Sequence, residues 1–309
     1  MKTAFLFPGQ GAQAVGMGAD LYESSTVYRA MFDACQAQAG LDLQSACFEG
    51  KGMDNSGVIQ AAIYSHTVSL LGAVRAAGAD ADVFAGLSLG EYSALAAADV
   101  LDAARGAALV RQRGEIMDGA VPPGTGGMLS VVGLTLEQVE TVIAPFASVF
   151  VANHLSETQL TLGGLLGELG EAKAALEAAG ARMAVMLAMK GPSHCPLLNA
   201  AAEQFSVELA GETFDAPSGI VYSNVLGEPY PKNADFRRLL CTQMNTRVRW
   251  HDCIEQMLAH GVTRFIEIGP GGVLTKMLKR RASREIALYS VQDEASFEVF
   301  LRAEKEGGT

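Results

Sequence analysis

A serine flanked by two glycines has the residue types for nucleophilic chemistry. Residues 86–90 read Gly-Leu-Ser-Leu-Gly, with Ser88 at the centre. In a nucleophile elbow this pattern joins a strand to a helix through a sharp turn that exposes the serine Oγ. Residues 82–85 predict a short buried strand and residues 92–98 an Ala-rich helix, so the setting fits. The alternative is a plain glycine-rich turn between a strand and a helix.

A histidine more than a hundred residues later has the properties of a general base. His194 lies in the segment Pro192-Ser193-His194-Cys195, just ahead of a helix predicted over residues 197–209. The N-terminus of a helix disfavours the imidazolium form, so a histidine there tends to stay neutral, as a base must. A capping or packed histidine is the alternative.

An arginine on an apolar helix stripe indicates an anion in the interior. Arg113 falls on the same stripe as Leu109 and Ile116 in the helix predicted after Asp102, whereas Arg111 points elsewhere. A buried guanidinium keeps its charge and must meet an anion or hydrogen-bond acceptors. That anion is either a ligand or a carboxylate of the chain itself in a structural ion pair.

Composition excludes several classes of function. The 309 residues carry a formal net charge of −11, which argues against a general nucleic-acid binder. The five cysteines are scattered and lack a Cys-x-x-Cys pair, and the five histidines lack metal-ligand spacing. We therefore predict reduced thiols in the cytoplasm, no metal site and no cofactor. The longest apolar run, residues 58–74, contains Gln60 and His66 and predicts a buried helix rather than a membrane span.

The order of elements predicts an α/β fold. A strand at residues 5–7 enters a glycine-rich turn at 8–13, which lacks the usual nucleotide-binding spacings. Helical periodicity follows over residues 22–47 and 58–77, before the strand and elbow around Ser88. Strands alternating with helices indicate a mainly parallel sheet.

A second, smaller unit is predicted after the Pro/Gly-rich segment 121–127. The pattern there is βαββαβ, the order of a ferredoxin-like subdomain. Its predicted strands span residues 128–132, 148–152, 159–162 and 182–186, and its helices 136–144 and 166–179. We expect residues 124–190 to form this inserted subdomain, and residues 1–123 with 191–309 to form the larger one.

The last third of the chain resumes the larger subdomain. Its predicted elements are strands at 220–224 and 264–268, helices at 235–244 and 252–260, a basic helix after Gly272 and a flexible tail after Glu304. The basic residues near the end are Lys276, Lys279, Arg280, Arg281 and Arg284. They form either the solvent-exposed face of that helix or a binding surface for an acidic partner.

Taken together, these segments resemble the malonyl-CoA:acyl carrier protein transacylase family over essentially the whole chain. The matching stretches are, in order, Phe7-Pro8-Gly9-Gln10-Gly11, residues 86–95, Arg111-Gln112-Arg113-Gly114, Pro192-Ser193-His194-Cys195, Gln243 ahead of Val248-Arg249-Trp250, and Glu267-Ile268-Gly269-Pro270-Gly271. The resemblance implies an α/β-hydrolase-like large subdomain with a ferredoxin-like insertion.

The resemblance also implies a role for each matched residue. Ser88 would be the nucleophile and His194 its base, with Gln243 in support. The backbone N–H groups of Gln10 and Leu89 would form the oxyanion hole. Arg113 would pair with the free carboxylate of the acyl group, and Cys195 is not expected to be the nucleophile.

The implied activity is ping-pong transfer of a malonyl group from malonyl-CoA to the phosphopantetheine thiol of acyl carrier protein. The expected enzyme is a cytoplasmic monomer that serves fatty-acid synthesis, with the carrier docking near Lys276, Lys279, Arg280 and Arg281. The alternatives are an acyltransferase of a polyketide or malonate-decarboxylase system, a serine acyl hydrolase, and a non-catalytic carrier-binding scaffold.

Two positions depart from the family pattern. The residue before the nucleophile is usually histidine and here is Leu87. The usual Asn-Ser-Pro-x-Gln run becomes Leu155-Ser156-Glu157-Thr158-Gln159, preceded by an additional His154. These departures concern the polar lining opposite Ser88, and with it the preference for acyl chain and carrier.

Overall fold

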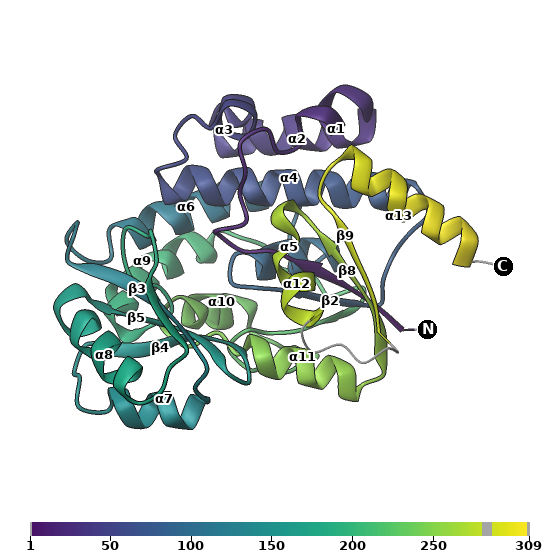
Figure 1. The fold of residues 1–309 in the computed structure, drawn as a ribbon. Helices are drawn as coiled ribbons and strands as arrows, with labels where there is room; N and C mark the ends of the chain where they lie inside the picture. Colours follow the sequence, from purple (N-terminus) through teal and green to yellow (C-terminus); the bar gives the residue numbers. More distant parts are fainter. Residues whose placement is uncertain (1, 280–285, 308–309) are drawn as a thin grey trace. The chain divides into compact units, whose positions relative to one another are not determined.

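The computed structural model describes residues 2–279 and 286–307, and it has a mixed α/β architecture (Figure 1). The described residues form a five-stranded parallel sheet and a separate four-stranded antiparallel sheet. This arrangement confirms the fold class predicted from the sequence.

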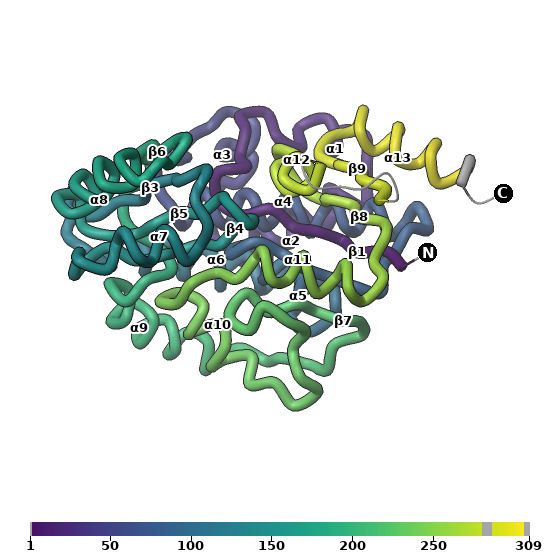
Figure 2. Tube along the Cα trace, turned by 60° about the horizontal axis from the view of Figure 1, so that its bottom comes forward, coloured from purple at the N-terminus to yellow at the C-terminus, as the bar shows by residue number. Residues whose placement is uncertain are grey.

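The parallel sheet aligns the turns that follow its strands. Its order is β7-β2-β1-β8-β9. The strands are β1 (Lys2–Phe7), β2 (Val83–Gly86), β7 (Ile220–Val221), β8 (Val262–Ile268) and β9 (Ala287–Val291). Figure 2 shows β8 beside β1, with which it pairs in parallel. Phe7 pairs with Gly86, so β1 and β2 end together. Functional turns of open α/β sheets gather at this carboxyl edge.

The helices of the first hundred residues differ from the prediction in one place. The single helical stretch expected over residues 22–47 is three helices, α1 (Ala19–Ser24), α2 (Thr26–Ala39) and α3 (Leu43–Glu49). Ser25 begins α2 by accepting a hydrogen bond from the Tyr28 backbone N–H. Gly40, with φ +62°, ends it in the left-handed conformation. The helical spacing of apolar residues continues across these caps, so the sequence pattern did not indicate where one helix ends and the next begins.

The longest helix is a core element. Helix α4 (Ser56–Ala76) is the one helix in the described part of the chain that is long and apolar enough to cross a membrane, but 89% of its most apolar window is buried inside the protein. It packs against α2 and α5 (Gly90–Ala97), and α5 packs on β1 and β2. Helix α6 (Arg105–Asp118) follows. The burial of α4 agrees with the buried helix predicted over residues 58–74.

The antiparallel sheet has the predicted βαββαβ order. Its strands are β3 (Gly126–Val132), β4 (Val149–Ser156), β5 (Gln159–Leu165) and β6 (Met183–Met186), in the order β4-β5-β3-β6, with helices α7 (Leu136–Ile143) and α8 (Leu166–Ala178) between them. Apolar residues from these strands and helices share one buried core. The side chain of Thr135 and the side chain of Gln138 form a capping box that starts α7.

The remaining elements correct two predictions. They are the short 3₁₀ turns Pro196–Leu198 and Pro270–Gly272 and helices α9 (Asn199–Ala210), α10 (Phe236–Asn245), α11 (Trp250–Ala259), α12 (Val273–Lys279) and α13 (Glu294–Gly307). The flexible tail predicted after Glu304 is wrong, because α13 continues to Gly307. The strand predicted over residues 220–224 is only the two-residue β7.

Contacts along the chain separate two compact units. Unit 1 comprises residues 1–114, 213–222 and 257–309, and unit 2 comprises residues 115–212 and 223–256. Unit 1 holds the parallel sheet and unit 2 the antiparallel sheet. The predicted domain boundaries, at residues 123/124 and 190/191, follow the ends of the antiparallel sheet instead and stay a prediction.

Candidate active site

Close backbone contacts determine which residues fit the turn around Ser88 in unit 1. Ser88 lies two residues after the end of β2 and has φ +53°, a strained value for a residue with a side chain. A Cβ on Gly86 would lie 1.9 Å from the carbonyl O of Gly90, and a Cβ on Gly90 would lie 2.1 Å from the carbonyl O of Phe7. Only glycine fits both positions. The strand–turn–helix geometry of a nucleophile elbow is therefore present.

Arg113 lies beside the serine. The Arg113 side chain is 1% exposed. Its Nη2 donates to Ser88 Oγ at 3.2 Å and its Nη1 donates to Gln60 Oε1 at 2.8 Å. Its guanidinium carbon is 5.4 Å from the centre of the Tyr92 ring. Burial lowers the pKa of Arg113 from its ordinary value, while Tyr92 and Glu91 raise it. The group nevertheless stays a cation, because guanidinium does not lose its proton in proteins.

A chain of amides connects the arginine to the N-terminal turn. Gln60 on α4 is 1% exposed, and its Nε2 donates to Gln10 Oε1 at 3.1 Å. Gln10 Nε2 in turn donates to Ser56 Oγ at 3.3 Å. Sequence reasoning did not assign Gln60 a role. The available signal was an amide inside an otherwise apolar helix, since a buried amide must find partners.

The turn that carries Gln10 lies against the elbow. Leu87 donates its backbone N–H to the carbonyl O of Phe7 at 3.0 Å. A Cβ on Gly9 would lie 2.6 Å from the carbonyl O of Leu87. Leu89 is the N-cap residue of α5. The first N–H groups of the helix, those of Gly90 and Glu91, donate to the carbonyl O atoms of Leu87 and Ser88. The oxyanion hole formed by the N–H groups of Gln10 and Leu89 stays a prediction.

The motif around Glu267 has a structural role. The Glu267 carboxylate is fully buried and accepts hydrogen bonds from the backbone N–H groups of Leu274 and Thr275. Burial raises the pKa of Glu267, and these hydrogen bonds oppose the rise. A Cβ on Gly269 would lie 2.8 Å from the Pro8 ring. The motif thus packs against the turn that leads to Gln10.

His194 in unit 2 is held by a backbone carbonyl. It is 3% exposed and has φ +54°. Its Nδ1 is 2.7 Å from the carbonyl O of Gln243, and Gln243 is itself 1% exposed. Because a carbonyl only accepts, Nδ1 carries the hydrogen, and Nε2 of the neutral ring is the atom that accepts a proton. This is the tautomer that a general base requires.

The neighbour of His194 is not a second nucleophile. Cys195 is 1% exposed, and burial raises the pKa of its thiol to about 11. A thiol that stays protonated at neutral pH is a poor nucleophile. This agrees with the sequence interpretation, which favoured Ser88.

The other predicted positions are placed only in part. Lys276 and Lys279 lie in the last turn of α12, and Lys276 Nζ donates to the carbonyl O of Gly271 at 2.8 Å. Arg280, Arg281 and Arg284 lie outside the described residues. Within residues 2–279 and 286–307, no group of three or more His, Cys, Asp or Glu side chains could hold a metal ion.

The additional His154 is a buried polar group. It lies on β4, is 7% exposed, and its ring centre is 4.6 Å from that of His251. Its Nε2 is buried with no hydrogen-bond partner. Burial, together with His251, lowers the pKa of His154 to about 4. In unit 1, burial lowers the pKa of His66 to about 4 as well, and His66 Nδ1 is hydrogen-bonded to the Tyr28 hydroxyl at 2.7 Å.

The two depressed histidine pKa values predict acid sensitivity. Between pH 6.5 and 4 the unfolded chain binds protons that the folded chain does not, so the free energy of unfolding falls as pH falls through this window. The free energy of unfolding falls in both proteins between pH 7 and pH 4.5. We expect this fall to be about 1–2 kcal/mol smaller in the variant His154→Leu than in the unsubstituted protein. Urea unfolding at both pH values measures the difference. Equal losses in the two proteins would contradict the assignment to His154.

Comparisons with known proteins agree with this geometry. Residues 4–304 match the family described as "Acyl transferase domain". The malonyl CoA-acyl carrier protein transacylase of Bacillus subtilis (strain 168) is 34% identical over 312 residues, which cover 99% of this chain and 98% of the relative.

Two solved structures are closely similar. The malonyl CoA-acyl carrier protein transacylase from Clostridium perfringens superposes with a TM-score of 0.95 at 34% identity, covering 100% of this chain and 98% of the other. A malonyl-transacylase in complex with its type II PKS acyl-carrier protein superposes with a TM-score of 0.93 at 33% identity, covering 98% of this chain and 100% of the other.

Proposed function

The chain belongs to the acyl transferase domain family, and on that premise we propose that it transfers a malonyl group from malonyl-CoA to acyl carrier protein. The observation that supports this substrate is the buried Arg113 cation, 3.2 Å from Ser88 Oγ. A short acyl group on Ser88 that ends in a carboxylate brings its charge within reach of that guanidinium. An uncharged acyl group offers the guanidinium no charge to attract.

The first half-reaction loads the enzyme. Ser88 Oγ attacks the thioester carbonyl of malonyl-CoA while His194 Nε2 accepts the hydroxyl proton. The backbone N–H groups of Leu89 and Gln10 stabilise the oxyanion of the tetrahedral intermediate. The C–S bond then breaks, and CoA leaves as a thiol with the proton from His194. The product is a malonyl ester on Ser88.

The second half-reaction transfers the malonyl group from Ser88 to the carrier. The phosphopantetheine thiol of the carrier gives its proton to His194 and attacks the ester carbonyl. The C–O bond breaks, and Ser88 Oγ recovers the proton. Throughout, the Gln243 carbonyl holds the imidazole in one tautomer, and no dedicated carboxylate is needed. Neither half-reaction requires a metal ion or a cofactor.

We further propose a cytoplasmic monomer that supplies fatty-acid synthesis. The carrier docks near Lys276 and Lys279, with Arg280 and Arg281 adjacent in sequence. Acyl carrier proteins and CoA are anionic, and complementary charge steers their encounter with a basic surface.

A direct test separates transfer from hydrolysis. The protein is incubated with malonyl-CoA and holo acyl carrier protein, and free CoA, malonyl carrier and malonate are measured. We expect free CoA and malonyl carrier in equal amounts, and parallel lines in double-reciprocal plots of initial rate. Release of malonate with the carrier left unloaded would identify a hydrolase instead.

A further inference from the structure

Two histidines of unit 2 meet where β4 contacts the start of α11. His154 lies on β4 and is 7% exposed, and its ring centre is 4.6 Å from that of His251, the second residue of α11. Both residues belong to unit 2. The proposed mechanism gives neither side chain a role.

The backbone joins the same two parts of the chain. The His154 N–H donates to the carbonyl O of Val248 at 2.9 Å, and the Val248 N–H donates to the carbonyl O of Ala152 at 2.9 Å. The two segments form an isolated parallel bridge rather than a strand pair. Because few hydrogen bonds hold this bridge, its stability depends on the side chains packed around it.

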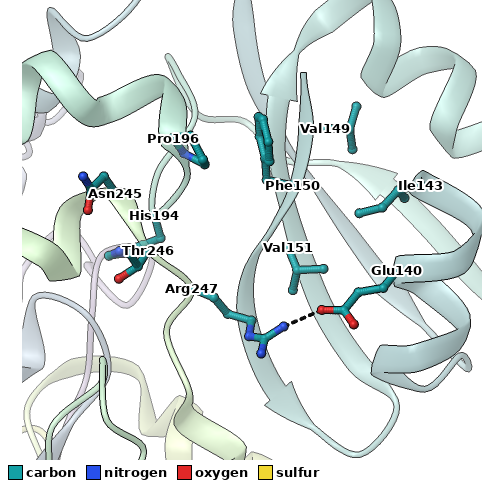
Figure 3. Close-up of a pocket in the computed structure, with 10 residues that line it drawn as sticks. All are labelled: Glu140, Ile143, Val149, Phe150, Val151, His194, Pro196, Asn245, Thr246 and Arg247. Atoms are coloured by element: carbon teal, nitrogen blue, oxygen red, sulfur yellow. Dashed lines mark hydrogen bonds and ion pairs between the residues drawn. The ribbon is translucent and has the colours of Figure 1, made fainter. Parts of the chain in front are cut away.

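The bridge adjoins the group that orients the base. The Gln243 carbonyl O, which accepts from Nδ1 of His194 at 2.7 Å, lies five residues before Val248. In the intervening segment, Arg247 pairs with Glu140 on α7 at 2.6 Å (Figure 3). These two side chains are 34% and 52% exposed, so the ion pair contributes little to stability. Residues 243–248 therefore connect the carbonyl that holds the base to the bridge with β4.

The surroundings of His154 oppose a positive charge. Its Nε2 is buried with no hydrogen-bond partner. Burial, followed by the neighbouring His251, lowers the pKa of His154 to about 4. Arg247 also lowers this pKa, whereas Asp252 on α11 and Glu140 on α7 raise it. The ring is therefore neutral at pH 7, and a proton on it would lie beside a second imidazole and a guanidinium.

We propose that His154 and His251 make the bridge between β4 and residues 243–248 sensitive to protons, and that this bridge keeps His194 in position. A protonated His154 favours opening of the bridge, because the charged ring gains hydration when β4 and Val248 separate. The Gln243 carbonyl then no longer holds the imidazole of His194. His154 is thus a positioning residue, and only its effect on acyl transfer rests on the proposed function.

Proton linkage gives the size of the effect. When the bridge opens, His154 reaches water and its pKa returns toward about 6.5. Between pH 7 and pH 5 the open form takes up a proton, whereas the closed form, with a pKa of about 4, takes up little. The equilibrium constant for opening should therefore rise about 20-fold over this range.

Amide hydrogen exchange, resolved by NMR at pH 7 and pH 5, measures this opening. After correction for the intrinsic pH dependence of exchange, protection of the His154 and Val248 N–H groups should fall about 20-fold in the unsubstituted protein. His154→Phe keeps a ring of similar size without a titrating group, and its protection should change less than about threefold. His251→Gln should give an intermediate fall, because burial still lowers the pKa of His154.

The matched control is His260→Gln. His260 lies in unit 1, and its Nδ1 is 2.8 Å from the Tyr222 hydroxyl, a hydrogen bond that glutamine can replace. This variant should keep the full loss of protection at His154 and Val248. The free energy of unfolding of each variant at pH 7 reports whether its fold is intact.

The acylation of Ser88 by malonyl-CoA measures the effect on His194. Its rate falls in acid in every variant, because His194 acts as a base. At pH 4, half or more of the His154 rings carry a proton. The fall in rate from pH 7 to pH 4 should therefore be at least about twofold larger in the unsubstituted protein than in His154→Phe.

The outcomes separate this inference from the proposed function. Equal losses of protection in the unsubstituted protein and His154→Phe would show that the bridge does not respond to His154. Equal falls in acylation rate, with protection lost only in the unsubstituted protein, would overturn the link to His194. If malonyl-CoA does not acylate the unsubstituted protein at pH 7, the proposed function is wrong, and hydrogen exchange alone decides whether the bridge is proton-sensitive.

Discussion

Replacing Ser88 with alanine is expected to reduce malonyl transfer to acyl carrier protein by about 10⁴-fold or more. The substitution removes the oxygen that forms the ester, and covalent catalysis has no substitute for it. The change itself is small, since alanine keeps the Cβ and loses only the hydroxyl at the tight turn. The measurement is the initial rate of malonyl-carrier formation at saturating malonyl-CoA.

A matched control distinguishes chemistry from folding. Ser93 is a buried serine on α5, five residues from Ser88, and the mechanism gives it no role. Ser93→Ala should retain transfer within a fewfold of the unsubstituted rate. If Ser88→Ala transfers malonyl groups as fast as Ser93→Ala, Ser88 is not the nucleophile.

Replacing Arg113 is expected to change the preference between malonyl-CoA and acetyl-CoA rather than to abolish acyl transfer. Without the guanidinium, the free carboxylate of the malonyl group has no counter-charge in a buried site. We expect kcat/KM for malonyl-CoA to fall about 10²- to 10³-fold in Arg113→Ala, equivalent to about 3–4 kcal/mol. We expect kcat/KM for acetyl-CoA to rise, because without the guanidinium the site is more apolar and suits a neutral acyl group.

A second substitution at Arg113 separates the loss of charge from the loss of packing. Arg113→Ala leaves a cavity next to Gln60 and Tyr92, whereas Arg113→Met fills most of the volume without charge. Both variants should show the same change in the ratio of malonyl to acetyl transfer, and the Tm of each reports any loss of fold. If malonyl transfer is unchanged in Arg113→Met, the arginine does not bind the acyl carboxylate.

The elbow and the small sheet could be predicted from sequence because their signals are local. Gly86 and Gly90 are required by contacts within a few residues or with the adjacent strand β1. The βαββαβ order was predicted correctly, whereas β4 and β5 run to Ser156 and Leu165, beyond their predicted ends at residues 152 and 162. Local rules suffice where the chain folds on itself over short distances.

The environment of Arg113 could not be predicted, because its partners come from elsewhere in the sequence. The helical stripe correctly indicated an inward-facing side chain, but it left a ligand and a structural ion pair equally open. Gln60 lies 53 residues away and joins Arg113 only through the packing of α4. A buried amide has no periodic signature, so its role required coordinates.

The C-terminal elements were missed for a different reason. Strand β9 (Ala287–Val291) is short, and its residues are mostly half-buried rather than alternating. Helix α13 carries many charges and shows only a few apolar positions. Pairing with β8 stabilises β9, which is a tertiary effect that overrides weak local preference.

The central claim is that the malonyl group travels on the Ser88 hydroxyl, and intact-mass spectrometry with peptide mapping tests it most directly. After brief mixing with malonyl-CoA, the unsubstituted protein should gain one malonyl group, mapped to the peptide that contains Ser88, and should lose it when holo acyl carrier protein is added. A malonyl group on another residue, or a loaded carrier without any acylated protein along the way, would contradict the account.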